Sequence, residues 1–233
     1  MQVTVCIPTL NEEEGIGPTL DAVDRNAFAH KDWDLELLVI DGDSKDGTKA
    51  EAEARGARVV IEPRKGYGRA YKRGFAEAHG DVIVTGDADG TYPFETCHEL
   101  VQLLLDEDLD FITCDRYGDI GDGAMSPKHR LGNWVLSATM RALFWVKVKD
   151  SQSGMWIIRR DALGRLPIES LPEGMAFSQQ IKLEAFKRRD VKAAEVPSSL
   201  RARIGDAVIE SWRDGLVNLG DLWAKRFTTR WSR

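Results

Sequence analysis

Apolar runs alternate with longer amphipathic segments through the first half of the chain. The runs are almost continuously hydrophobic, which is typical of strands in a sheet covered on both faces. We expect strands over residues 3–8, 35–40, 58–61, 81–85 and 110–114. Helical spacing follows over residues 13–26, 45–55, 68–78 and 93–107. This alternation predicts an α/β fold with a mostly parallel central sheet and helices on both faces.

Polar and acidic residues follow several of the predicted strands. Segment 8–12 (PTLNE) follows the first strand, segment 41–44 (DGDS) follows the second, and Asp87 and Asp89 follow the fourth. Each segment alone also fits an ordinary turn or helix N-cap. Because ligands bind beyond the carboxyl ends of strands in such sheets, the convergence of three acidic loops at one edge predicts a binding site.

Asp87 and Asp89 are separated by one alanine, so an extended chain would point both carboxylates to the same side. Two carboxylates about 4 Å apart repel by about 1 kcal/mol in water and about 4 kcal/mol at an effective dielectric constant near 20. A divalent cation would remove this repulsion, and Mg²⁺ and Mn²⁺ both prefer carboxylate oxygens. The alternative is a simple Asp-Gly turn at Asp89 and Gly90.

Two other phosphate-binding motifs are incomplete. Segment 66–71 (GYGRAY) begins like G-x-G-x-x-G, but Tyr71 stands at the third glycine and acidic residues fill the loop after the first strand. A dinucleotide-binding dehydrogenase needs its glycines in that first loop. No G-x-x-x-x-G-K-[ST] sequence is present, which excludes a P-loop kinase.

The composition is that of a soluble globular protein of one large domain, or a domain with a short appendage. The net charge of −6 argues against a nucleic-acid partner. Cys6, Cys97 and Cys114 are widely spaced in apolar surroundings, so we expect free core thiols in a reducing compartment. We expect no signal peptide and no membrane span, since the nearest apolar run, 131–146, is interrupted by Arg141.

Several ordered blocks resemble the family 2 glycosyltransferases with a GT-A fold, in particular the dolichyl-phosphate mannose or glucose synthase group. The match runs from residue 3 to about residue 205 and includes the pair Arg116-Tyr117 and a late RARIG segment. The longer blocks are VCIPTLNEEEGI (5–16), LLVIDGDSKDGT (37–48), RKGYGRAYKRGFAEAHGDVIVTGDADGTYPFE (64–95) and DSQSGMW (150–156).

This resemblance implies roles for individual residues. The nucleotide-sugar donor would be bound by Pro8, Leu10, Glu12, Ile40, Asp41, Asp43, Asp87, Ala88, Asp89, Arg116 and Arg203. Asp87 and Asp89 would hold Mg²⁺ or Mn²⁺ on the diphosphate. Arg130, Asp150 and Ser153 would form the acceptor region. Asp89, Arg116 and Arg130 are the predicted catalytic residues, the arginines supplying positive charge for phosphate groups.

The chain departs from the family pattern at three places. Thr91 stands where the family often has a glutamine, and Gly42 replaces the second aspartate of a D-D-x-S run, with Asp43 one place later. Near the end, Ala202 occupies the position of an arginine and Val208 that of a lysine. We expect Arg203 to substitute for the missing arginine.

The resemblance implies inverting transfer of a hexose from a GDP- or UDP-linked donor to a polyprenyl (dolichyl) phosphate. Such an acceptor needs no general base, because a phosphate monoester with a second pKa near 6 is already anionic at neutral pH. This agrees with the absence of histidine from the acidic loops. Two alternatives are a hydroxyl acceptor on a soluble molecule or glycan, with Asp150 as base, and a non-catalytic nucleotide-sugar-binding scaffold.

Residues 206–233 form a separate segment after the predicted catalytic domain of residues 1–205. Six apolar residues recur there at helical spacing: Ile209, Trp212, Leu216, Leu219, Trp223 and Phe227. Four basic residues cluster at the end of this segment: Lys225, Arg226, Arg230 and Arg233. The pattern predicts an amphipathic helix that either lies on a membrane, placing the protein at the cytoplasmic membrane face, or packs on the domain or a second subunit. The sequence indicates no oligomeric state.

Overall fold

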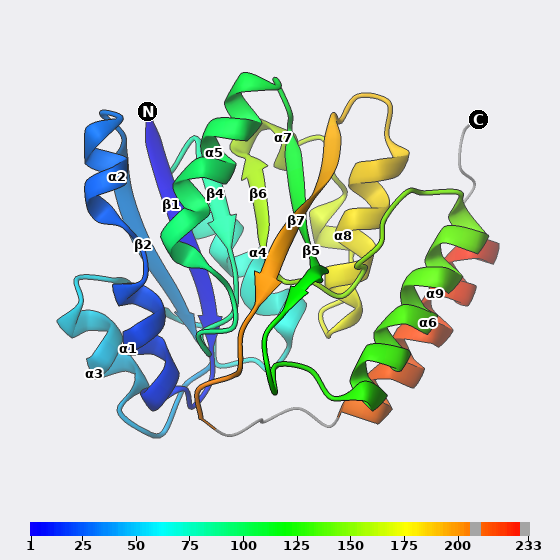
Figure 1. Cartoon of the computed structure of the whole chain (residues 1–233), viewed down its shortest axis with the longest axis horizontal. Coiled ribbons are helices and arrows are strands. Elements are labelled where there is room, and N and C mark those ends of the chain that lie inside the picture. The colour runs from blue at the N-terminus through cyan, green and yellow to red at the C-terminus, as the bar shows by residue number, and fades with distance from the viewer. Residues whose placement is uncertain (206–210, 229–233) are drawn as a thin grey trace.

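The computed structural model describes residues 1–205 and 211–228, without the side chains of 211–214. Its centre is a seven-stranded sheet in the order β3-β2-β1-β4-β6-β5-β7 (Figure 1). The strands are β1 (Gln2–Thr9), β2 (Asp34–Asp41), β3 (Arg58–Ile61), β4 (Val82–Thr85), β5 (Phe111–Ile120), β6 (Trp156–Arg159) and β7 (Ala193–Leu200). Only β6 is antiparallel to its neighbours among the described strands. The predicted mostly parallel sheet is therefore confirmed.

Helices cover both faces of the sheet, as predicted. On one face α1 (Glu13–Asp21), α2 (Arg25–His30), α3 (Thr48–Ala54) and α5 (Cys97–Asp106) enclose a core that includes Ile16, Leu20, Phe28, Val101 and Leu104. On the other face α4 (Tyr67–Glu77), α7 (Arg160–Leu163) and α8 (Ala176–Lys187) enclose Tyr71, Phe75, Phe177 and Ile181. Short 3₁₀ turns, η1 (Phe94–Thr96) and η2 (Ile168–Ser170), precede α5 and α8.

The predicted helix over 13–26 is divided in the structure. It ends at Asp21, and α2 begins after Asp24, whose side chain accepts a hydrogen bond from the Ala27 amide at 3.0 Å. An aspartate at this position satisfies an amide that has no partner within the helix. The helical period continues through this break, which is why the pattern alone merged the two helices.

Two further helices stand beside the sheet, next to α8 (Figure 1). α6 (Pro127–Phe144) and α9 (Ser211–Thr228) pack on each other and on α8 around Met140, Phe144, Leu183 and Leu222. Within the described residues, none of the helices combines the length and apolar character that crossing a membrane requires. The three cysteines are free and buried, as predicted.

Candidate active site

The loops after β1 and β4 meet closely at the carboxyl edge of the sheet. Gly15, in the first turn of α1, lies so near the β4 loop that an added Cβ would be 2.6 Å from the Ala88 carbonyl oxygen and 3.0 Å from the Asp89 Cα. A side chain at Gly15 would push the two loops apart. The convergence predicted for this edge is therefore realised through direct backbone contact.

Asp89 is buried, and both of its carboxylate oxygens accept hydrogen bonds. Its Oδ1 accepts from the Thr91 hydroxyl at 2.7 Å and the Thr91 amide at 3.2 Å, and its Oδ2 accepts from Arg203 at 3.0 Å. Arg203 also pairs with Glu12, and the amide of Ile204 donates to the Asp89 carbonyl at 2.9 Å. Thr91 thus orients Asp89, and the segment after β7 closes over the β4 loop.

Asp87 has much weaker partners than Asp89. Its Oδ1 lies 3.4 Å from the Tyr67 hydroxyl. Burial raises the pKa of Asp87 to about 7, the nearby Asp89 carboxylate adds to this, and Arg116 and Arg203 oppose it. Removing solvent and adding a like charge both disfavour the ionised form of a carboxyl group. The ionised form of Asp87 is therefore only partly compensated by the described protein.

The oxygen donors of Asp87 and Asp89 fit a divalent cation. Within the described residues no three His, Cys, Asp or Glu side chains come together as a metal centre made of protein alone. Mg²⁺ commonly takes only one or two carboxylates and completes its shell with water and substrate phosphates. The poorly compensated Asp87 beside Asp89 has the chemistry of such a partial site.

Arg116, whose charge also acts on Asp87, forms a bidentate ion pair with Asp150. Asp150 has no solvent exposure, and its carboxylate accepts from Arg116 Nε at 2.6 Å, Nη2 at 3.0 Å and the backbone amide at 3.2 Å. Burial alone would raise the pKa of Asp150, but the Arg116 guanidinium outweighs it and the pKa is lowered. The Arg116 side chain retains 12% exposure, while Asp150 has none.

The predicted nucleotide-binding residues of the first two loops differ in exposure. Leu10 and Asp43 are exposed, while Asp41 is buried and accepts from the Ser44 amide and hydroxyl at 3.0 and 2.6 Å. Ile40 is fully buried in the core beneath α4, so its side chain does not face these loops. Pro8 is partly exposed at the end of β1, and Ala88 is buried between Asp87 and Asp89.

The acceptor residues do not form one cluster of free side chains. Arg130 is exposed in the first turns of α6, near Tyr117, whose pKa its charge lowers against the stronger effect of burial and Asp150. Ser153 is completely buried, and its carbonyl accepts from the Trp156 indole at 2.9 Å. Ser153 therefore supports the loop rather than presenting a hydroxyl to a ligand.

Four residues near the site had no role assigned from the sequence. Tyr67 donates to Asp87, and Tyr92 accepts from the Gly154 amide at 2.6 Å. Lys182 binds the loop that contains Asp150, and Glu195 accepts from the Asp150 amide at 2.9 Å. Tyrosines and charged residues in helices and strands carry no sequence signal for such contacts. Tyr67 and Tyr92 both lie within the block 64–95 that resembles the family, which is the signal that could have identified them as site residues.

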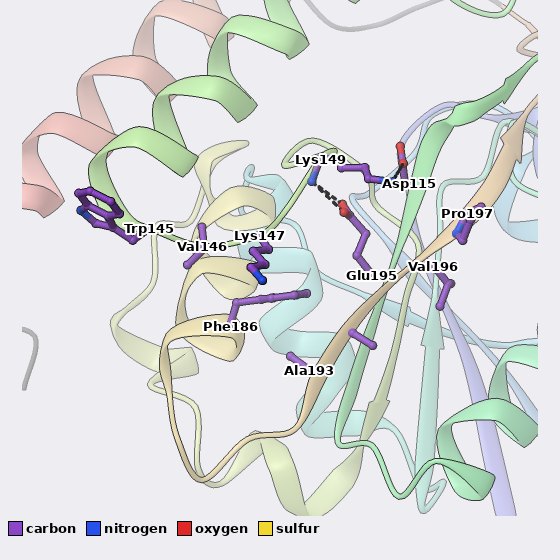
Figure 2. Close-up of a pocket in the computed structure, with 11 residues that line it drawn as sticks. Asp115, Trp145, Val146, Lys147, Lys149, Phe186, Ala193, Glu195, Val196 and Pro197 are labelled. Carbon is purple, nitrogen blue, oxygen red and sulfur yellow. Dashed lines mark hydrogen bonds and ion pairs between the residues drawn. The ribbon is translucent and has the colours of Figure 1, made fainter. Parts of the chain in front are cut away.

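A pocket of about 540 Å³ lies along the edge strand β7 (Figure 2). Asp115, Lys149 and Glu195 mark its polar side, and Phe186 and Val146 line the apolar side. Glu195 holds the Lys149 amide at 2.8 and 2.9 Å. The pocket does not include Asp87 or Asp89, so it is separate from the predicted donor site.

Comparisons with known proteins agree with the resemblance found in the motifs. Residues 4–166 match the family described as glycosyl transferase family 2. The Haloferax volcanii low-salt glycan biosynthesis hexosyltransferase Agl6 is 35% identical over 91% of this chain, which spans 51% of that relative's length. The dolichyl-phosphate hexose transferase of the same organism is 30% identical, with 91% of this chain and 89% of that protein covered.

The fold also matches solved structures. Glucosyl-3-phosphoglycerate synthase from Mycobacterium tuberculosis, solved with Mn²⁺, UDP-glucose and phosphoglyceric acid, has a TM-score of 0.77 and 25% identity. The match covers 98% of this chain and 81% of that one. The likeness confirms the predicted GT-A fold. By the family match and the two archaeal relatives together, the chain belongs to glycosyl transferase family 2.

Proposed function

We propose that the chain is a metal-dependent, inverting glycosyltransferase that moves a hexose from a GDP- or UDP-linked donor to a polyprenyl phosphate. The observation that carries this proposal is the contrast inside the site. Asp87, beside Asp89, has a carboxylate that the described protein only partly compensates, while Asp150, the carboxylate proposed as base for a hydroxyl acceptor, is buried and bound by Arg116. A general base must be able to reach and take a proton.

On the donor side, Asp87 and Asp89 would hold Mg²⁺ or Mn²⁺, which would neutralise the departing nucleoside diphosphate. Solved with Mn²⁺ and UDP-glucose, the mycobacterial synthase of the same fold supports this choice of cofactor. Arg203 joins Asp89 to Glu12 of the loop after β1. Leu10 and Asp43 lie in the adjoining loops, and Asp41 is the last residue of β2. We infer that these loops bind the base and ribose of the donor.

On the acceptor side, the partly exposed Arg116 and the exposed Arg130 would bind the acceptor phosphate through charge-assisted hydrogen bonds. A phosphate monoester is already nucleophilic, so no residue has to remove a proton during transfer. The name of the archaeal dolichyl-phosphate hexose transferase supports this acceptor class. The same site would act on a glycan hydroxyl only with a base other than Asp150.

The surface formed by α6 and α9 suits a lipid acceptor. Large apolar side chains remain exposed on both helices: Leu131, Trp134, Val135, Leu216, Val217, Trp223 and Phe227. Leu222 and Asn218 face inward instead, so α9 is docked on the domain while most of its described apolar stripe stays outside. Tryptophan beside basic residues favours the headgroup region of a bilayer. We infer that residues 206–233 help to hold the protein peripherally at the cytoplasmic membrane face.

The test is a transfer assay with the purified chain, Mn²⁺ and radiolabelled UDP- and GDP-sugars. Label should appear in organic extracts when polyprenyl phosphate is present, and it should disappear when a chelator replaces Mn²⁺. Label on a glycan or soluble hydroxyl acceptor would overturn the lipid assignment. Donor binding without transfer to any acceptor would identify a nucleotide-sugar-binding scaffold.

A further inference from the structure

Lys182, on the inner face of α8, is a fully buried lysine. Its Nζ donates to the Ser151 carbonyl at 2.8 Å, the Ser153 carbonyl at 2.5 Å and the Ser178 hydroxyl at 3.2 Å. These acceptors match the three N–H bonds of an ammonium group. In the described part of the chain, no carboxylate lies within ion-pair distance of Lys182. The ammonium group of Lys182 thus binds two backbone carbonyls of the loop 150–154.

A packing role alone accounts poorly for this residue. Burying a charged group is unfavourable, and apolar side chains of similar volume are often neutral or stabilising replacements. Burial lowers the pKa of Lys182 to about 7, and the Asp150 carboxylate opposes that shift. Its ring contact, 5.7 Å from Nζ to the Trp156 centroid, could be made equally well by a methionine. What a methionine could not do is hold the carbonyls of Ser151 and Ser153.

The loop that Lys182 holds, residues 150–154, connects both halves of the candidate site. At one end Asp150 binds Arg116 with both carboxylate oxygens. At the other end Gly154 donates to Tyr92, and an added Cβ there would lie 3.1 Å from Asp87 Oδ1 and 2.7 Å from the Tyr67 hydroxyl. A small shift of this loop would therefore turn Arg116 and crowd Asp87.

The same loop is fastened to the helices beside the sheet. The Ser151 amide donates to the Ser137 hydroxyl of α6 at 3.0 Å, and Asn218 of α9 donates to Gln152 at 3.1 Å. These contacts bind the outer part of the loop. On the inner side Lys182 donates to both carbonyls, and the Ser153 carbonyl also accepts from the Trp156 indole at 2.9 Å and the Ser178 hydroxyl at 3.1 Å. Loss of Lys182 would therefore act chiefly through the Ser151 carbonyl.

We propose that Lys182 is a positioning residue for glycosyl transfer: it fixes the 150–154 loop so that Asp150 directs the Arg116 guanidinium toward a phosphate group of the bound substrates. This inference rests on the proposed function for its kinetic consequence. The structural part of the inference is that the contacts of Asp150 and Gly154 depend on Lys182. That part does not require the proposed function.

The first test is amide hydrogen exchange of the intact chain. In Lys182→Met the amides of Arg116, Gln152 and Gly154 should exchange faster, because each donates to a group whose position the loop sets. The matched control is Lys72→Met, since Lys72 Nζ also donates to two carbonyls, those of Glu169 and Leu171, at 2.8 and 2.7 Å. The control should leave the three amides unchanged. Unchanged exchange in Lys182→Met would overturn the proposal.

The second test is a kinetic cycle with Arg116→Ala. Lys182→Met should lower kcat by on the order of 100-fold in the wild-type background, as expected when a group is displaced from its productive position. It should lower kcat by less than about threefold in Arg116→Ala, because a residue that acts through Arg116 has no further effect once Arg116 is gone. Multiplying losses would overturn the proposal. If Lys182→Met does not fold, Lys182→Gln, which keeps an amide donor, takes both tests.

The two tests separate failure of the inference from failure of the proposed function. If the wild-type chain transfers no hexose to polyprenyl phosphate, the proposed function fails, and hydrogen exchange alone decides whether Lys182 positions the loop. If transfer occurs but exchange does not respond to Lys182→Met, the function stands and the inference is wrong.

Discussion

Asp87 and Asp150 are both influenced by Arg116, and their surroundings shift their pKa values in opposite directions. The pKa of Asp150 is lowered, because Arg116 outweighs the effect of burial. The pKa of Asp87 is raised to about 7 by burial and by Asp89. The difference lies in the partner: Asp150 has a guanidinium in bidentate contact, and Asp87 has a tyrosine hydroxyl at 3.4 Å. One carboxylate is compensated within the protein, and the other is only partly compensated by the described residues.

The largest expected effect, on the rate of transfer, comes from removing a carboxylate of the proposed metal site. Asp89→Asn and Asp87→Asn should each reduce transfer by at least about 100-fold, because the cation contributes several kcal/mol to the departing diphosphate. Without metal, Asp87→Asn should unfold at a higher temperature near pH 8, since a buried, poorly compensated carboxylate is gone. Initial rates at saturating donor and thermal unfolding measure the two effects.

Asp34→Asn is the control for these variants, because Asp34 is exposed at the opposite end of β2. It should change neither property. Near-wild-type turnover of Asp89→Asn or Asp87→Asn in the presence of a chelator would contradict the metal assignment.

Breaking the compensated pair should lower stability as well as transfer. Arg116→Ala leaves Asp150 buried without its cation, and removing one partner of a buried pair costs about 3–5 kcal/mol of unfolding free energy. Adding Asp150→Asn should recover part of that loss, because the remaining buried charge is removed. Urea unfolding of the single and double variants measures this coupling. Strictly additive losses would mean that the pair does not hold Asp150 in its ionised form.

Arg130→Ala should behave differently from Arg116→Ala. Arg130 is exposed, so its loss should change the unfolding free energy by less than about 0.5 kcal/mol. If it binds the acceptor phosphate, the acceptor KM should rise or kcat should fall by the equivalent of about 1.5–3 kcal/mol. Steady-state kinetics with varied polyprenyl phosphate tests this. Kinetic constants equal to wild type would assign Arg130 to the solvated surface of α6.

The smallest expected effect is on how thermal stability depends on pH, and it tests the assignment of Asp87 as a metal ligand. Its folded pKa of about 7 exceeds the unfolded value of 3.8, so its contribution favours folding at low pH and is lost as the pH rises toward 7. Mn²⁺ competes with the proton for the same oxygens, so the rise in Tm on adding Mn²⁺ should be larger near pH 8 than near pH 5. Asp87→Asn should abolish this difference. An equal rise at both pH values would separate Asp87 from the metal.

The sequence predicted the part of the fold in which each strand is followed by a helix. β1 to β5 lie where the apolar runs indicated, because parallel strands buried on both faces are hydrophobic along their length. β6 and β7 were not predicted. β6 has four residues and runs antiparallel between β4 and β5, and β7 is an edge strand that contains Pro197 and two serines. Edge strands lack the continuous apolar pattern.

For the site, the spacing of Asp87 and Asp89 and their place after β4 could be read directly. The contacts that distinguish one carboxylate from another could not. Arg203 reaches Asp89 across 114 positions and Glu12 across 191, and Arg116 reaches Asp150 across 34. No pattern in the sequence around Lys182 indicates that its side chain points inward. Such pairings depend on tertiary structure.

The two edge strands of the sheet, β3 and β7, are poorly suited to pairing with strands of other chains. An edge strand offers unpaired amides and carbonyls to any other chain with a free edge. Here β3 is only four residues long, and β7 carries Pro197, which has no amide to donate, near the bulge where β5 shifts register between Asp115 and Asp119. Neither edge makes a good template for strand addition. Self-association at high concentration would therefore proceed through the exposed apolar side chains of α6 and α9, a contact that mild detergent should reverse.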